Sequence, residues 1–223
     1  MTANLRIDKV WKYFGDYPAV RDVTFAAGPG ECVALLGRNG AGKTTLLRIA
    51  AGLSRASEGS VAASGSLGWL GHGIGVYEEL SALENLTIFA RLQEVAKPRN
   101  RAAEWLKRVY LDHVQDARVR EFSRGMRQRL AVARAFIHDP GIVLFDEPFT
   151  SLDDRAIALL QAILAEGLQR GKIVILSTHQ LREAMELATH VALLDRGQLK
   201  YFGGRPEEML SDPGWLYRAH GVA

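Results

Sequence analysis

The chain has 223 residues, of which 48% are hydrophobic and 24% charged, as expected of a globular domain with a sizeable core. The net charge of +3 is too small to indicate a nucleic-acid partner, and a single cysteine, Cys32, excludes an internal disulfide. No apolar stretch reaches the ~18–20 residues of a membrane span, and the first residues lack the apolar region of a signal peptide. We therefore expect a cytoplasmic protein that reaches a membrane only through another protein.

The predicted elements begin with β-strands. Residues 5–14 and 19–36 are rich in β-branched and aromatic side chains with alternation, a pattern typical of half-buried strands. A helix is predicted from residue 45 to about 52, where a glycine closes a helix-forming run. Residues 59–70 then predict short strands interrupted by glycine.

The middle of the chain is predicted to be helical. Apolar residues at helical spacing indicate helices over residues 81–95, 99–110 and about 126–137, with Pro98 between the first two. Because residues 80–138 show no strand pattern, we expect them to form a helical subdomain inserted between two parts of a core.

The remaining sequence returns to alternating strands and helices. Residues 141–146 and 172–177 are apolar runs typical of buried parallel strands. Two helices and a hairpin are predicted around them, over residues 154–166, 181–187, and 191–194 with 198–202. The chain is thus predicted to be an α/β protein with an antiparallel β-edge. Because the helical insert is internal to the core's chain order, we expect a single domain over residues 1–223.

Residues 37–45 carry the most specific motif. They read Gly-Arg-Asn-Gly-Ala-Gly-Lys-Thr-Thr and fit the phosphate-binding loop pattern G-x-x-x-x-G-K-[ST], preceded by a predicted strand and followed by a predicted helix. Glycines let successive N–H groups face a phosphate, Lys43 can reach the β- and γ-phosphates, and the Thr44 hydroxyl can bind Mg²⁺. The alternative is a glycine-rich turn that fits by chance. The predicted ATP-binding residues in this loop are Gly37, Arg38, Asn39, Gly40, Ala41, Gly42, Lys43, Thr44 and Thr45.

Polar residues close two of the predicted strands. Asp146 and Glu147 follow the apolar run at 141–146, where side chains of a parallel strand open into a ligand crevice. Asp146 can hold Mg²⁺, expected to be through water, and Glu147 can polarise an attacking water. His179 closes the strand at 172–177 and can donate a hydrogen bond to the γ-phosphate. The alternatives are a strand-capping turn and a partly buried histidine with a backbone partner.

A further motif precedes the helix predicted at 126–137. In Phe122-Ser-Arg-Gly-Met126, Ser123 is a plausible N-cap. The N-terminus of the helix that follows could therefore bind an anion. Taken alone, these residues favour simple helix capping.

Together and in this order, the motifs resemble the ATP-binding subunit of ATP-binding-cassette (ABC) transporters, over about residues 5–205. The resemblance implies a P-loop NTPase (RecA-like) core and a catalytic role for Glu147 and His179. It also places the family's Q-loop glutamine position on His72 and an adenine-stacking aromatic at Phe14, with Tyr13 as the alternative. It assigns the Walker B strand to 142–147, the D-loop to 151–153 with Asp153, and the signature motif to Ser123, Arg124, Gly125 and Met126.

The same resemblance implies ATP and Mg²⁺ as cofactors, a head-to-tail homodimer, and a membrane permease on the cytoplasmic face. The chain departs from the family pattern at His72, Arg124 and Met126. The retained Ser123 and Gly125 imply that contacts to the partner's γ-phosphate persist, whereas Met126 removes a glutamine that contacts the ribose. Docking on the permease is expected along residues 72–86, through Val76, Tyr77, Leu80 and Leu83.

Within the family, residues 68–72 and 79–86 are similar to the ATP-binding subunit of the haem exporter of cytochrome c maturation. Exporters of drugs, sodium or polysaccharide share much of this pattern and remain alternatives. A soluble ABC ATPase of DNA repair or translation is a further alternative, although such proteins usually carry paired cassettes or long coiled-coil inserts. A P-loop kinase would explain residues 37–45 but not residues 122–126 or His179.

Overall fold

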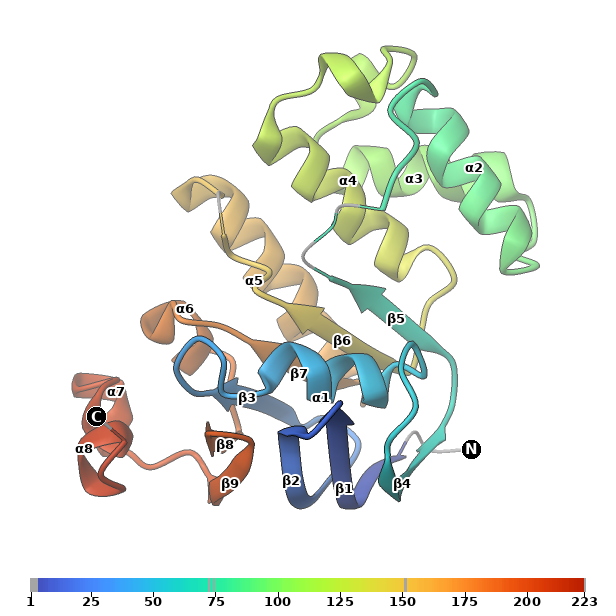
Figure 1. The fold of residues 1–223 in the computed structure, drawn as a ribbon. Helices are drawn as coiled ribbons and strands as arrows, with labels where there is room; N and C mark the ends of the chain where they lie inside the picture. Colours follow the sequence, from blue (N-terminus) through green and yellow to red (C-terminus); the bar gives the residue numbers. More distant parts are fainter. Residues whose placement is uncertain (1–3, 72, 74, 151, 223) are drawn as a thin grey trace.

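A computed structural model describes residues 4–71, 73, 75–150 and 152–222. Its centre is a twisted sheet (Figure 1), which within these residues has nine strands in the order β4-β1-β2-β9-β8-β3-β7-β6-β5. The strands are β1 (Asn4–Phe14), β2 (Tyr17–Ala27), β3 (Cys32–Leu36), β4 (Glu58–Ser64), β5 (Leu67–Leu70), β6 (Ile142–Asp146), β7 (Ile173–Ser177), β8 (His190–Asp195) and β9 (Gln198–Gly204).

The sheet combines an antiparallel edge with a parallel core, as the sequence predicts. β1 pairs antiparallel with β2 and β4, and the predicted hairpin of β8 and β9 joins this edge to the core. β3, β6 and β7 are buried at every position, because their continuous apolar runs are covered on both faces. The parallel pairs β3·β7, β6·β7 and β5·β6 bring the carboxyl ends of these strands to one edge.

Helices cover both faces of this sheet. One buried cluster joins α1 to the N-terminal strands, and the other joins the remaining helices to the opposite face. Cys32 lies fully buried in the second cluster, and burial raises the pKa of its thiol to about 12. The helices are α1 (Lys43–Ala50), α2 (Ala82–Leu92), α3 (Pro98–Arg108), α4 (Arg124–Phe136), α5 (Asp154–Gln169), α6 (Leu181–Met185), α7 (Glu208–Ser211) and α8 (Trp215–Ala219).

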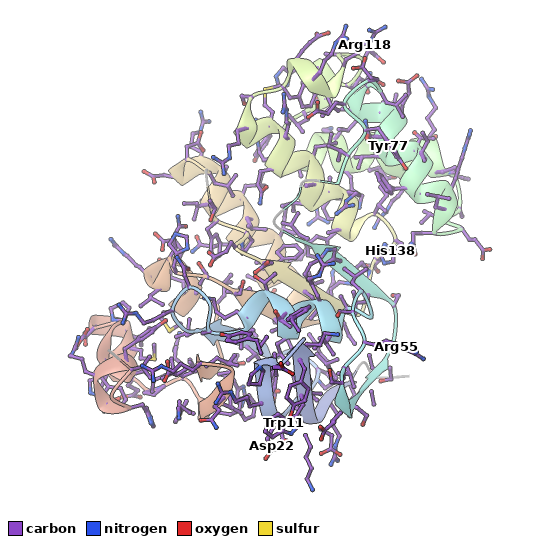
Figure 2. All side chains as sticks on the ribbon, in the orientation of Figure 1. Trp11, Asp22, Arg55, Tyr77, Arg118 and His138 are labelled. Carbon is purple, nitrogen blue, oxygen red and sulfur yellow. The ribbon has the colours of Figure 1, made fainter. Side chains whose placement is uncertain are left out.

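The predicted helical insert is present between β5 and β6, as α2, α3, α4 and the short 3₁₀ turns Asp112–Val114 and Val119–Glu121. A capping box between Ser81 and Glu84 starts α2, and Pro98 occupies the first turn of α3, where its missing N–H costs nothing. α4 begins at Arg124, earlier than predicted, because the Ser123 hydroxyl accepts a hydrogen bond from the Met126 N–H. Figure 2 shows Tyr77 and Arg118 on this part of the molecule.

Two short helices near the C-terminus, α7 and α8, are not predicted from the sequence. Each is too short to show a helical apolar period. Their apolar residues Met209 and Leu216, and Val222 beyond α8, are nevertheless buried against the core. Among the described helices, none is long and apolar enough to cross a bilayer.

Candidate functional site

A cavity of about 400 Å³ opens around the phosphate-binding loop. It lies where β3 ends and α1 begins, and one carboxylate and two aromatic side chains complete its wall. The lining residues are Phe14, Tyr17, Ala19, Asn39, Gly40, Ala41, Gly42, Lys43, Thr44, Thr45 and Glu147. Seven of these eleven belong to residues 39–45, so the predicted loop forms most of the cavity.

The loop depends on glycine at two positions where the chain runs against neighbouring backbone. Gly37 has a φ of +146°, and a Cβ there would lie 2.4 Å from the Leu194 carbonyl oxygen. Gly42 has a φ of +100°, and a Cβ would lie 2.5 Å from the Ala19 carbonyl oxygen. Only glycine meets both demands, so the loop can curl with its N–H groups converging at the N-terminus of α1.

Lys43 lies in the curl of the loop and is 7% exposed. Its Nζ donates hydrogen bonds to the carbonyl oxygens of Gly37, at 2.7 Å, and Arg38, at 3.1 Å. Burial lowers the pKa of this ammonium, while the charges of Glu147 and Asp146 raise it. A phosphate oxygen entering the loop would compete with these two carbonyls for the Lys43 hydrogens.

Thr44, in the phosphate-binding loop, and Asp146, at the end of β6, are in contact although they are 102 positions apart. The Thr44 hydroxyl donates to Oδ2 of Asp146 at 2.8 Å and lies 3.1 Å from Oδ1. The Ser177 hydroxyl donates to Oδ1 at 2.5 Å from the adjacent strand β7. Asp146 is 2% exposed, and these hydroxyls hold its carboxylate in place. A hydroxyl and a carboxylate beside a phosphate loop form the hard oxygen set that Mg²⁺ prefers, so the predicted residues fit this metal.

Glu147 leaves β6 in a conformation unusual for its residue type. Its φ is +55°, and its N–H donates to the Ser177 carbonyl oxygen at 3.0 Å. Its carboxylate lies on the cavity wall, with Oε2 2.8 Å from Nδ1 of His179 and 3.2 Å from the His179 N–H. The carboxylate is mostly buried, whereas the imidazole is mostly exposed. The two residues predicted to be catalytic are therefore in direct contact.

Of the aromatic candidates, Phe14 lines the cavity and Tyr13 does not. Tyr13 stacks on Trp11 with ring centroids 5.9 Å apart. Tyr17 also lines the cavity, although no sequence motif indicated it, and it pairs with Phe14 across the turn between β1 and β2. The Gly15-Asp16 turn between two aromatic strands is the signal that could have located Tyr17.

The sequence model of the family described as "ABC transporter" matches residues 20–150. This span contains the loop, the helical insert and the Asp146-Glu147 pair. The chain belongs to the ABC transporter family. Within this family it is an ATP-binding subunit, and it is an ATPase.

Named relatives and a solved structure agree with this membership. The cassette is 35% identical over 208 residues to an uncharacterized ABC transporter ATP-binding protein of Methanocaldococcus jannaschii, covering 91% of this chain and 78% of that protein. It is 36% identical over 224 residues to the Nod factor export ATP-binding protein I of Cupriavidus metallidurans, covering 94% and 74%. A dimeric ATP-binding cassette in a post-hydrolysis state, bound to ADP and phosphate, superposes with a TM-score of 0.80 at 25% identity, covering 91% and 99%. The P-loop NTPase fold predicted for the cassette is confirmed.

The residues predicted to form the signature motif lie apart from the phosphate-binding loop. Ser123 is exposed at the start of α4, with Arg124, Gly125 and Met126 in the first helical turn. The lining of the loop cavity, over the described chain, includes none of these four residues. Asp153 caps α5 by accepting a hydrogen bond from the Ala156 N–H at 2.8 Å. His72 lies outside the described residues.

The segment expected to dock on a permease is only partly available on the surface. Tyr77 is 53% exposed, but Leu83 is 5% exposed and packs in the core, so the expectation for Leu83 is wrong. The Asn85 side chain accepts from the Tyr77 N–H at 2.7 Å and donates to its carbonyl oxygen at 2.9 Å, which orients this segment. α2 has to bury one face, and Leu83 lies on that face.

Proposed function

We propose that this ATPase binds ATP and Mg²⁺ in the cavity of residues 37–45 and hydrolyses the γ-phosphate with Glu147 as the base. The observation that carries the proposal is the position of Glu147 on the cavity wall, one residue after the Asp146 carboxylate that holds Thr44. The same wall therefore offers a metal-binding carboxylate and a second carboxylate able to take a proton from water.

Each residue of the site has a proposed task. The N–H groups of residues 39–45 bind the phosphates, and Lys43 exchanges its two carbonyl partners for phosphate oxygens. Thr44 and Asp146 would hold Mg²⁺, which would neutralise charge that develops on the phosphates. Glu147 orients and deprotonates the attacking water, and His179 moves from Glu147 to the γ-phosphate. Phe14 stacks on the adenine, with Tyr17 beside it.

The signature residues are proposed to act on the ATP of a second copy. Ser123 stands at the N-terminus of α4 on the helical insert, and its own loop cavity does not include it. A head-to-tail pair would place this helix end and its dipole on the partner's γ-phosphate. The dimeric cassette bound to ADP and phosphate supports such a pair. Two equal sites would result from the two-fold symmetry.

We further propose that the chain is one nucleotide-binding domain that drives a permease from the cytoplasmic side of the membrane. One buried cluster includes residues of the helical insert and of the parallel strands, in keeping with a single domain. The exposed Tyr77 and the neighbouring Leu80 offer a surface to the permease, and His72 is proposed to couple nucleotide state to it.

For the transported substrate, the relatives favour an exporter. The name of one relative refers to Nod factor export. Haem export stays a prediction from residues 68–72 and 79–86, and no relative named here carries that function. Because the substrate path belongs to the permease, the identity of the neighbouring genes would indicate the substrate. Neighbouring genes of cytochrome c maturation would favour haem export.

The proposed hydrolysis is tested by following γ-labelled ATP with water as the only acceptor. The expected result is release of inorganic phosphate by the wild-type protein and loss of nucleotide binding in Lys43→Ala. A P-loop kinase, the main rival, would release little phosphate until a small-molecule acceptor was added.

The proposed permease is tested by membrane association. The chain should sediment with membranes only when the neighbouring permease is co-expressed, and tight binding to protein-free liposomes would contradict this proposal.

A further inference from the structure

The last helix of the described chain reaches the first residue of the phosphate-binding loop. The hydroxyl oxygen of Tyr217, on α8, accepts a hydrogen bond from the Gly37 N–H at 2.9 Å. The two residues are 180 positions apart. Tyr217 belongs to none of the motifs from which the site was predicted.

The segment that carries Tyr217 is firmly held. Leu216 and Met209 are fully buried on either side of the α7–α8 connection. At the start of the segment, the Arg205 guanidinium donates to the Met185 carbonyl oxygen, and the Arg205 N–H donates to the Thr189 carbonyl oxygen at 2.9 Å. Met185 ends α6, the helix that follows His179, and Figure 1 shows α6, α7 and α8 on the same side of the molecule. Residues 205–222 thus connect the segment after His179 with the phosphate-binding loop.

Gly37 is contacted from three directions. Its N–H donates to Tyr217, its carbonyl oxygen accepts from Lys43 at 2.7 Å, and the Leu194 carbonyl oxygen lies 2.4 Å from the position that a Cβ would take. Gly37 is buried, so without the hydroxyl its N–H would lose its partner inside the protein, which is costly. Tyr217 therefore holds the peptide group that carries the Gly37 N–H, and the next peptide group, which carries the Gly37 carbonyl, accepts the hydrogen bond from Lys43.

The surroundings keep the Tyr217 hydroxyl neutral. Burial raises the pKa of this phenol, the bond from Gly37 acts against that rise, and the negative charge of Glu147 adds to it. The hydroxyl is therefore a neutral group within the electrostatic reach of the proposed catalytic carboxylate.

We propose that Tyr217 is a positioning residue for ATP hydrolysis, which fixes the first peptide group of the phosphate-binding loop and makes residues 205–222 part of the ATP site. The inference rests on the proposed ATP site and adds a residue to it. The remaining N–H groups and Lys43 still bind phosphate when the hydroxyl is lost. Loss of the hydroxyl should therefore displace the loop and slow hydrolysis, while ATP binding changes little.

The test compares two tyrosine hydroxyls. Tyr217→Phe removes the contact to Gly37 and keeps the ring. Tyr201→Phe is the matched control, because the Tyr201 hydroxyl donates to the Gly204 carbonyl oxygen at 2.8 Å, away from the loop. We expect kcat to fall by about tenfold in Tyr217→Phe with KM for ATP changed by less than about threefold. Tyr201→Phe should keep both values, and hydrogen exchange of residues 33–43 should accelerate only in Tyr217→Phe.

Unchanged kcat and unchanged exchange in Tyr217→Phe would overturn the inference, as would a rise in KM with normal kcat. Tyr217→Leu, which removes the ring as well as the hydroxyl, is a second variant, and at least the same loss of kcat is expected. Lys43→Ala is measured alongside. If it binds ATP normally, the ATP site itself is wrong and the inference fails with it; if only Lys43→Ala is defective, the role of Tyr217 alone is wrong.

Discussion

Nδ1 of His179 lies 2.8 Å from Oε2 of Glu147, and the same oxygen accepts the His179 N–H at 3.2 Å. The two residues follow the adjacent strands β7 and β6, so the parallel pairing of those strands brings them together. Glu147 reaches this position with a φ of +55°, a conformation that costs about 1–3 kcal/mol and is typical of functional sites. Glu147 also lines the cavity around the phosphate-binding loop, and the two observations together support the chemical role proposed for the pair.

The first prediction concerns this pair. Glu147→Gln keeps the size of the side chain but cannot take a proton, so turnover should fall by about 10²–10⁴-fold. ATP binding should persist, because Lys43 and the loop N–H groups are untouched. Single-turnover hydrolysis and equilibrium binding of a fluorescent ATP analogue measure the two effects separately. Near-normal turnover would remove Glu147 from the mechanism.

The second prediction concerns the loop backbone. Gly42→Ala puts a Cβ 2.5 Å from the Ala19 carbonyl oxygen at a φ of +100°, so we expect loss of ATP binding and a lower Tm. Gly28→Ala is the control, because its Cβ would lie 3.8 Å from the nearest Glu31 side-chain atom, an ordinary contact. Thermal unfolding with and without ATP checks both variants. Equal ATP binding in the two would show that the loop tolerates a side chain there.

The third prediction concerns pH. The ring of His138 is partly buried, its Nε2 donates to the Leu67 carbonyl oxygen at 3.1 Å, and its buried Nδ1 has no hydrogen-bond partner among the residues that the structure describes. Burial lowers the pKa of His138, opposed by the bond to Leu67. Figure 2 shows the residue near β5, away from the loop.

The folded state therefore binds the His138 proton less readily than the unfolded state, whose pKa is about 6.5. The contribution of His138 to stability is present above that value and is lost as pH falls through and below it. We expect His138→Gln to lose less stability than the wild type between about pH 7 and pH 5, as measured by urea denaturation. The exposed His113→Gln should follow the wild type; an identical pH slope in His138→Gln would contradict the prediction.

The fourth prediction tests sharing of ATP between two copies. Homodimers of Lys43→Ala and of Ser123→Arg should each be inactive. In the mixed dimer one site carries both defects, and the other combines an intact Lys43 with an intact Ser123. Mixing should therefore restore part of the ATPase activity.

Strict cooperativity between the two sites would hide this recovery, so ATP-dependent dimerisation of Glu147→Gln is followed by size-exclusion chromatography as well. No recovery on mixing, together with a monomer at saturating ATP, would contradict the proposal that two copies share each ATP.

Some features could be read from the sequence because local chemistry decides them. The spacing of Gly37, Gly42, Lys43 and Thr44, between a predicted strand and a predicted helix, indicates a phosphate-binding loop. The apolar runs of β6 and β7 indicated buried parallel strands, and parallel pairing then required Asp146 and Ser177 to end side by side. Helix limits were less certain, since a single cap such as Ser123 moves the start of α4.

Other features depend on which elements pack together. Pairing across the β1–β2 turn places Tyr17 beside Phe14, whereas Tyr13 stacks on Trp11. Burial of one face of α2 removes Leu83 from the surface, although the sequence alone left it available for docking.

The sequence by itself determined the phosphate-binding loop, the two carboxylates at the end of β6 and the order of strands and helices as far as β9, since each depends on residues within a few positions of one another. Only the tertiary structure decided that Glu147 contacts His179 and that Tyr217 contacts Gly37. Those contacts join residues 32 and 180 positions apart, and no local pattern encodes them. They follow from burial of apolar faces along the whole chain, which fixes where each polar group comes to lie.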